Sequence, residues 1–170
     1  MLRERAGGAG ADPGVRLHVN GAASGGDELD LASLAAEEGV ADLVTFSGPV
    51  PAPALAAQFR AADVVAMPSA SETYGLVALE AQACGTPVLA HRVGGLVYAV
   101  LDGVSGRHVT AGTPEAWADA LAEILADRDA WAALGPGAVR HAAGHSWEAY
   151  ADGLLEAVAA VPRRSPGLDA

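Results

Sequence analysis

The stretch ADVVAMPSASETYGLVALE, residues 62–80, places three kinds of sequence one after another. Residues 63–67 are nearly all apolar, which is typical of a strand buried on both faces of a parallel sheet. A polar loop follows, and residues 76–84 then have the apolar character of a buried helix that ends at a C-cap glycine, Gly85. A strand, a loop and a helix in this order predict one βαβ unit of an α/β fold.

The same alternation extends outward in both directions. Because short strands alternate with helices, we expect a Rossmann-like parallel sheet with helices on both faces. Apolar periodicity predicts strands at 15–19, 43–46, 87–91 and 107–109, and helices at 28–38, 53–62, 95–101, 114–126, 128–142 and 147–161. The expected organisation is a helix remnant and loop (1–14), a Rossmann-like domain (15–145), a C-terminal helix (146–162) and a tail (163–170).

Composition narrows the class of protein. The chain has 170 residues, enough for one domain with a substantial core, and a net charge of −11, which argues against binding nucleic acid or an anionic membrane. Its 10 basic residues are all arginine, so a phosphate must be held by arginine, backbone N–H groups, a metal or another domain. No apolar run is long enough to span a bilayer, the start lacks the apolar centre of a signal peptide, and Cys84 is the only cysteine. The expected compartment is the cytoplasm.

The turn that opens the helix offers a ligand site at the carboxyl end of a strand, where α/β folds bind ligands. Gly75 lets a ligand approach the backbone, and the N–H groups that begin at Leu76 suit a phosphate. Glu72 can accept hydrogen bonds from a polar group beside that phosphate, and Glu80 can accept from the two hydroxyls of a ribose. Together they describe a nucleotide-sugar site.

A plainer interpretation stays open for each residue. A loop glutamate is usually solvated, a helix glutamate usually lies on a wet face, and Gly75 can serve the turn alone. One observation favours the ligand site: the helix around Glu80 has apolar neighbours on nearly every side, and a buried acid needs partners.

Residues 61–88, AADVVAMPSASETYGLVALEAQACGTPV, resemble the donor-site signature of group 1 (family 4) retaining glycosyltransferases with the GT-B fold. The likeness continues through VGGL (93–96), LDGVSG (101–106) and HSWE (145–148), and it is greatest to the branch that acts in actinobacterial mycothiol biosynthesis. The resemblance implies that this chain is the C-terminal half of a GT-B fold lacking its first strand. The acceptor-binding N-terminal domain and an Arg/Lys pair that clamps the donor pyrophosphate would then be missing.

The resemblance also implies roles for single residues. Glu80 would hold the ribose of UDP and Glu72, in the catalytic site, the hydroxyls of the donor sugar, while the backbone of Gly75 and Leu76 faces the pyrophosphate. Val50 would meet the nucleotide near its base. A magnesium ion, structural and not required for the chemistry, would lie among the residues that match the family's metal set: Phe59, Arg60, Ala62 and Thr86.

The implied reaction transfers N-acetylglucosamine from UDP-N-acetylglucosamine to an inositol-phosphate acceptor, with retention. The alternatives are a truncated, non-catalytic nucleotide-sugar-binding remnant and a transferase that uses another donor such as GDP-mannose. With no lysine and half of the fold absent, we expect the isolated chain to be weakly active or inactive.

Other residues carry weaker expectations. Cys84 is expected in the core, and the histidines show no metal-ligand spacing. His91 and Arg92 end a strand at the ligand edge and could reach the substrate. Trp147 is expected to anchor the last helix by packing, although the apolar face of that helix would be only partly covered without the N-terminal domain, which favours self-association.

Overall fold

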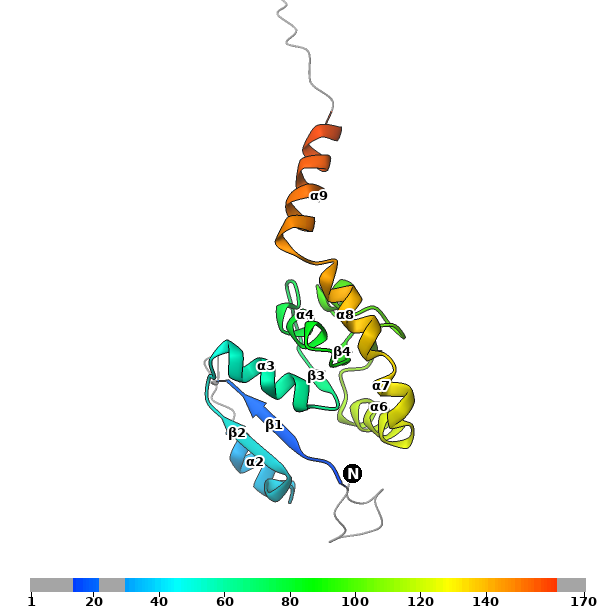
Figure 1. Cartoon of the computed structure of the whole chain (residues 1–170). Coiled ribbons are helices and arrows are strands. Elements are labelled where there is room, and N and C mark those ends of the chain that lie inside the picture. Colours follow the sequence, from blue (N-terminus) through cyan, green and yellow to red (C-terminus); the bar gives the residue numbers. More distant parts are fainter. Residues whose placement is uncertain (1–13, 22–29, 162–170) are drawn as a thin grey trace, which may run out of the picture.

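The computed structural model describes residues 14–21 and 30–161, so the expected helix remnant and the tail at 163–170 lie outside the described residues except for Gly14. Its strands form two parallel sheets (Figure 1). One sheet pairs β1 (Leu17–Asn20) with β2 (Val44–Ser47). The other has the order β3 (Val65–Met67), β4 (Val88–His91) and β5 (Gly106–Val109). The expected α/β fold with parallel strands is confirmed.

Helices cover both faces of the three-stranded sheet. Alternate residues of β4 point to opposite faces, and the residues on each face pack against a different set of helices. Val88 and Ala90 pack in one core cluster with residues of α3 (Ala52–Ala61), α4 (Leu76–Ala83) and α5 (Leu96–Ala99). Leu89 packs in a second cluster with Ile124 of α6 (Pro114–Ala126) and Trp131 of α7 (Arg128–Ala132). Each of these β4 residues is at most 1% exposed, so β4 is the centre of the core.

The first sheet is less covered. Within the described ranges β1 pairs with β2 alone and β3 with β4 alone, so no strand joins the two sheets. The expectation that residues 63–67 are buried on both faces is wrong for most of them: Met67 is buried, Val64 and Val65 are half-buried, and Ala66 is exposed. Because one edge of β3 has no strand beside it in the described part of the chain, fewer side chains cover it.

Local signals explain where the helices begin. Asp30 caps α2 (Leu31–Glu37): its carboxylate accepts from the backbone N–H of Ala32 and of Ser33 and from the Ser33 hydroxyl. The hydrogen bond from the Ser33 hydroxyl is the largest of the effects that hold the pKa of the Asp30 carboxyl below its usual value. Thr113 caps α6 in the same way, and a short 3-10 helix, η1 (Ala41–Leu43), leads into β2.

The single helix expected over 128–142 is wrong. The chain forms α7 and then α8 (Gly135–Ala143), with a break at residues 133–134. Pro136 explains the break: it has no N–H to donate to the carbonyl of Ala132, and in a continuous helix its ring would clash with that carbonyl. A Cβ built on Gly137 would overlap the Val104 carbonyl oxygen, so α8 packs closely against that loop.

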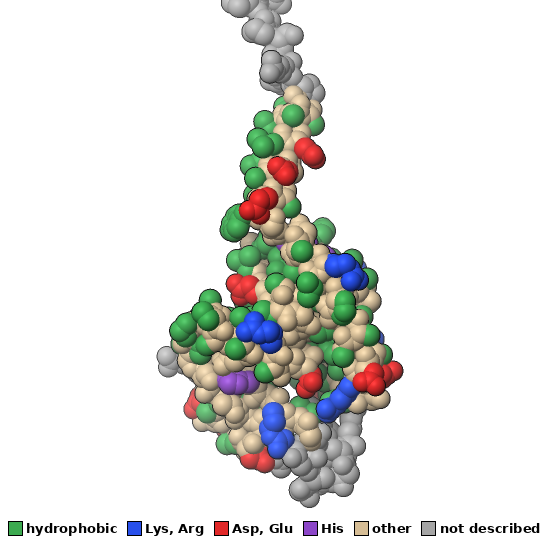
Figure 2. Space-filling view, viewed as in Figure 1, with side chains coloured by type: hydrophobic (Ala, Val, Ile, Leu, Met, Phe, Trp, Pro, Cys, Tyr) green, Lys and Arg blue, Asp and Glu red, His purple; other side chains and the backbone are tan. Residues whose placement is uncertain are grey.

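The last helix, α9 (Trp147–Ala160), projects from the body of the structure (Figure 1). All of its residues are exposed, and Trp147 is 83% exposed, so the expectation that Trp147 is a packing anchor is wrong. Figure 2 shows hydrophobic side chains along one side of α9 and acidic side chains along another. Across the described ranges, no helix combines the length and apolar character that crossing a bilayer demands.

Candidate functional site

The candidate site begins at the turn between β3 and α4. Gly75 caps α4 with a φ of +91°, in the left-handed region that favours glycine. A Cβ built on Gly75 would lie 2.7 Å from the Cβ of Ala99 and 3.2 Å from Cδ2 of Leu96, so the position also lacks room for a side chain. Among the described residues no side chain accepts from the N–H groups of α4 itself, which begins at Leu76. The first N–H groups of α4 therefore have no side-chain partner and remain available to a ligand.

Glu72 folds back onto the turn that it precedes. Its Oε1 accepts hydrogen bonds from the backbone N–H groups of Thr73 (3.0 Å), Tyr74 (3.4 Å) and Gly75 (3.2 Å). In the described part of the chain Oε2 makes no hydrogen bond, so one carboxylate oxygen holds the turn and the other stays available. Glu72 is half-buried beside the helix N-terminus.

Glu80 lies on the open face of α4. The buried face of the helix carries Ala78, Leu79, Ala81 and Gln82, and its exposed face carries Leu76, Val77, Glu80 and Ala83. The expectation that Glu80 is buried is therefore wrong. Its carboxylate makes no hydrogen bond or ion pair to any other described residue, and it shares this face with Leu76, the first residue of the helix.

The segment after β4 holds the Glu72 loop from the other side. The Gly95 N–H donates to the Glu72 carbonyl oxygen at 2.8 Å. A Cβ built on Gly94 would overlap that same oxygen, and one built on Gly95 would lie 2.6 Å from Cα of Tyr74. The two glycines thus permit a close backbone contact with the candidate site. Sequence reasoning left their role open between such an approach and a plain turn.

The predicted metal residues meet at a different place. The Thr86 hydroxyl donates to the Phe59 carbonyl oxygen at 2.6 Å, and the Ala62 N–H donates to the same oxygen at 3.1 Å. A carbonyl oxygen has two lone pairs, so these donors occupy the Phe59 oxygen fully. The residues do not fit a ready ion site, and Thr86 precedes β4, at the sheet edge opposite Glu72. Within the described ranges no cluster of three or more histidine, cysteine or acidic residues could hold a metal ion.

Val50 follows the carboxyl end of β2 and is half-buried. Cys84 packs against the core, and Arg92 is exposed directly after β4. None of these three side chains makes a hydrogen bond to Glu72 or Glu80.

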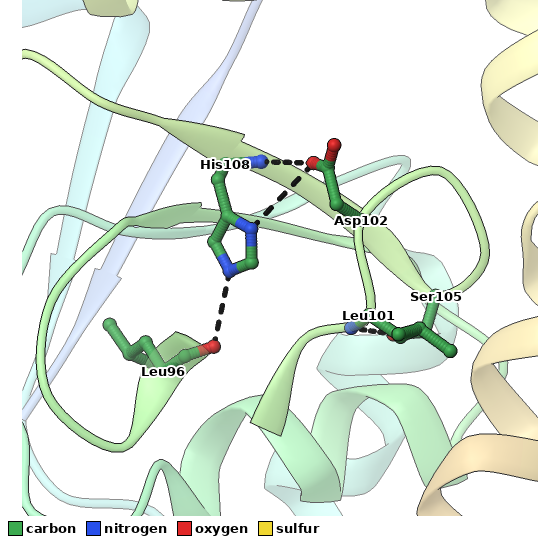
Figure 3. Close-up of polar contacts among 5 residues, drawn as sticks. All are labelled: Leu96, Leu101, Asp102, Ser105 and His108. Atoms are coloured by element: carbon green, nitrogen blue, oxygen red, sulfur yellow. Dashed lines mark hydrogen bonds and ion pairs between the residues drawn. The ribbon is translucent and has the colours of Figure 1, made fainter. Parts of the chain in front are cut away.

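Two histidine clusters were not anticipated. His108 has Nε2 3.2 Å from the Leu96 carbonyl oxygen and Nδ1 3.7 Å from Asp102 Oδ1, while its backbone N–H donates to that Asp102 oxygen (Figure 3). Only the Asp102-Gly103 turn preceding β5 could have indicated this contact. These bonds fix the 101–106 loop against α5.

The expectation that the histidines lack ligand spacing overlooked His141 and His145, which are one helical turn apart. Their rings meet at 4.6 Å between centroids. However, Nε2 of His141 faces the Tyr98 carbonyl oxygen and Nδ1 of His145 faces the His141 carbonyl oxygen. One nitrogen of each ring is therefore already bonded to the backbone.

The geometry suits a ligand that combines an anion with hydroxyl groups. The uncapped N–H groups and dipole of α4 attract negative charge, and the carboxylates of Glu72 and Glu80 accept from hydroxyls. Residues 3–141 match the family model "Glycosyl transferases group 1", so the chain belongs to the group 1 glycosyltransferases. The parallel strands and flanking helices correspond to the C-terminal half of the GT-B fold.

Relatives within the family carry one recurring name. The chain is 56% identical over 126 residues to a D-inositol 3-phosphate glycosyltransferase of Thermobispora bispora, covering 74% of this chain and 29% of that protein. It is 51% identical over 155 residues to the enzyme of that name from Segniliparus rotundus, covering 90% of this chain and 34% of the relative. The chain thus spans about a third of the length of these relatives.

A solved structure, Anabaena Alr3699/HepE in complex with UDP, aligns with a TM-score of 0.74 at 26% identity. The alignment covers 88% of this chain and 42% of that protein.

Proposed function

We propose that this chain is the donor-binding part of a cytoplasmic retaining glycosyltransferase that transfers N-acetylglucosamine from UDP-N-acetylglucosamine to an inositol-phosphate acceptor. The observation that carries the proposal is the open face of α4, where the unpaired carboxylate of Glu80 lies beside the uncapped N-terminus at Leu76. A diphosphate at the helix N-terminus places its ribose near Glu80. The names of the relatives, D-inositol 3-phosphate glycosyltransferases, support the acceptor, and the UDP complex of the solved neighbour supports the nucleotide.

Each residue then has a defined part in binding. Glu80 accepts from the ribose hydroxyls, and Val50 contacts the base. The backbone of Gly75 faces the pyrophosphate, and the N–H groups that begin at Leu76 donate to it. Glu72 accepts from hydroxyls of the sugar through Oε2 while Oε1 keeps its hydrogen bonds to the turn. The sugar is held with its reactive carbon beside the positive end of α4.

In the proposed reaction the bond from the sugar anomeric carbon to the β-phosphate oxygen breaks, and the acceptor hydroxyl attacks from the same face. The departing β-phosphate takes the proton of that hydroxyl, so no protein base is required and configuration is retained. The dipole of α4 stabilises charge that develops on the diphosphate. Because the sequence has no lysine, arginine is the only side chain of this chain that carries a permanent positive charge to add to this stabilisation.

A nucleotide panel in a thermal-shift experiment tests the donor class. A ligand present at ten times its Kd stabilises the folded chain by about 1.4 kcal/mol. We expect UDP and UDP-N-acetylglucosamine to raise the Tm, and uridine to have much less effect because it lacks the diphosphate. A larger rise in Tm with GDP or GDP-mannose would mean that the donor is a guanine nucleotide sugar and not a UDP-sugar. No shift with any nucleoside diphosphate would remove the proposed function.

Catalysis by the chain alone is a separate question. We expect nucleotide binding without measurable transfer, because the chain spans only about a third of its relatives and has no lysine to clamp a leaving diphosphate. A radiolabelled transfer assay onto inositol phosphate, run on the purified chain, decides this. Turnover without a partner protein would show that the acceptor site and the charge stabilisation lie within these residues.

A further inference from the structure

His91 joins the two loops that flank the carboxyl end of β4, the central strand of the three-stranded sheet. Its Nδ1 lies 3.0 Å from the carbonyl oxygen of Ser69, in the loop that leads from β3 to Glu72. On its other side, a Cβ built on Gly112, in the segment after β5, would lie 3.2 Å from Cε1 and 3.4 Å from Nε2 of His91. The half-buried ring therefore fills the space between these segments.

In the contact with Ser69, His91 is the hydrogen-bond donor. A carbonyl oxygen only accepts, so Nδ1 must carry the hydrogen and Nε2 of the neutral ring is unprotonated. Among the described residues Nε2 makes no hydrogen bond. The donor at Nδ1 is thus the part of the side chain that acts on the loop.

The loop from Pro68 to Gly75 is fastened at two points by the same segment. His91 holds it at the Ser69 carbonyl, and the Gly95 N–H holds it at the Glu72 carbonyl. Both donors come from β4 and the residues directly after it, whose backbone is fixed by the buried sheet. The place of Glu72 therefore depends on a hydrogen bond made three residues before it.

We propose that His91 is a positioning residue for Glu72, acting through the hydrogen bond from Nδ1 to the Ser69 carbonyl. This inference rests on the proposed function, in which Glu72 binds the sugar and Glu80 the ribose. Loss of the bond frees the loop at Ser69, so the carboxylate of Glu72 is no longer held where sugar hydroxyls meet it. Binding of the sugar weakens, and binding of the nucleotide does not.

Substitution by asparagine or glutamine tests the two ring nitrogens one at a time. In His91→Asn the amide N–H occupies the place of Nδ1, and in His91→Gln it occupies the place of Nε2. His91→Leu removes both ring nitrogens, including the donor at Nδ1, and keeps much of the volume. The readouts are amide hydrogen exchange across 69–75 in the ligand-free chain, and calorimetric affinities for UDP and for UDP-N-acetylglucosamine.

We expect His91→Asn to match the wild type in both readouts. His91→Leu and His91→Gln should exchange faster across 69–75 and lose about fivefold in affinity for UDP-N-acetylglucosamine relative to UDP, the factor that one hydrogen bond of about 1 kcal/mol represents. If His91→Leu fails to fold, the Asn and Gln variants decide.

Two results would overturn the proposal. One is the same behaviour in His91→Asn and His91→Leu, because then the donor is not what matters. The other is preserved sugar affinity in His91→Gln but not in His91→Asn, because the role would belong to Nε2. If the wild type binds neither ligand, the proposed function fails, and the exchange measurement still tests whether His91 holds the loop.

Discussion

At the residue scale, close backbone contacts and a buried side-chain amide decide which substitutions the candidate site tolerates. Gly94 and Gly95 let the segment after β4 touch the backbone of Glu72 and Thr73. Gln82 is fully buried, and its Nε2 donates to the carbonyl oxygens of Ala78 (3.0 Å) and Ala99 (2.7 Å). The glycine contact joins the Glu72 loop to the segment after β4, and the hydrogen bonds of Gln82 join α4 to α5. Both therefore support the elements that surround the candidate site.

Gly94→Ala should destabilise the chain and weaken nucleotide-sugar binding. The new methyl group would overlap the Glu72 carbonyl oxygen at a φ of +48°, and overpacking of this kind costs about 1–3 kcal/mol. Gly153→Ala is the matched control: nothing lies within 4 Å of its built Cβ, and alanine in a helix interior is favoured by about 1 kcal/mol over glycine. Thermal melts followed by circular dichroism compare the Tm of the two variants. An unchanged Tm for Gly94→Ala would show that the loop has room to move.

Gln82→Met should also destabilise the chain, because it leaves the Ala99 carbonyl oxygen without its donor while keeping the side-chain volume. An unsatisfied buried acceptor costs about 1–3 kcal/mol. Gln58 provides the comparison. Like Gln82 it has a buried Oε1 without a hydrogen-bond partner among the described residues, but its Nε2 donates to no described residue, so Gln58→Met should be neutral or stabilising. Urea unfolding curves compare the two. Equal losses in both variants would mean that the bonds of Gln82 contribute nothing specific.

At the element scale, α4 shows what the sequence could and could not predict. The helix, its glycine cap and its place after a strand were predicted from apolar pattern and turn chemistry. The burial of Glu80 was wrong because an alanine-rich helix has similar residues all round, so its pattern does not show which face is covered. The buried polar residue is Gln82, and Glu80 lies on the open face. The bond from His91 to Ser69 links segments 22 residues apart in the sequence and leaves no local signal.

The junction of α3 with the start of β4 bears on the magnesium prediction. Because Thr86 and Ala62 both donate to the Phe59 carbonyl oxygen, an ion there would have to break the bond from Thr86. We expect Mg²⁺ and EDTA to leave the Tm unchanged, and Thr86→Val to lower it by removing that hydrogen bond. A rise in Tm with Mg²⁺ that disappears in Thr86→Val would instead establish a structural ion at this junction.

At the scale of the whole molecule, open strand edges and the apolar side of one helix lack cover within the described residues. One edge of β1 has no strand partner, and the apolar side of α9 is exposed, with Leu155 68% and Val158 63% exposed (Figure 2). Open strand edges and apolar patches favour association. Incomplete cover of the apolar side of α9 was predicted from the sequence. The division into two sheets was not predicted, because strand pairing depends on contacts far apart in the chain.

We expect the chain to self-associate through α9 as its concentration rises. Leu154→Glu with Val158→Glu places charge on the apolar side and should reduce the mass measured by light scattering. Ala149→Glu, on another side of the helix, should leave that mass unchanged. A monomer at high concentration for the unmodified chain would contradict this expectation.

The central claim is that the open face of α4 binds a nucleoside diphosphate with Glu80 at the ribose. Calorimetric titration with UDP tests it in the chain, in Glu80→Ala, and in Glu37→Ala as a control at the end of α2. The account predicts binding by the unmodified chain and the control, and about tenfold weaker binding by Glu80→Ala, since a hydrogen bond to a charged group is worth about 1.5–3 kcal/mol. Equal affinity of Glu80→Ala and the unmodified chain would contradict it.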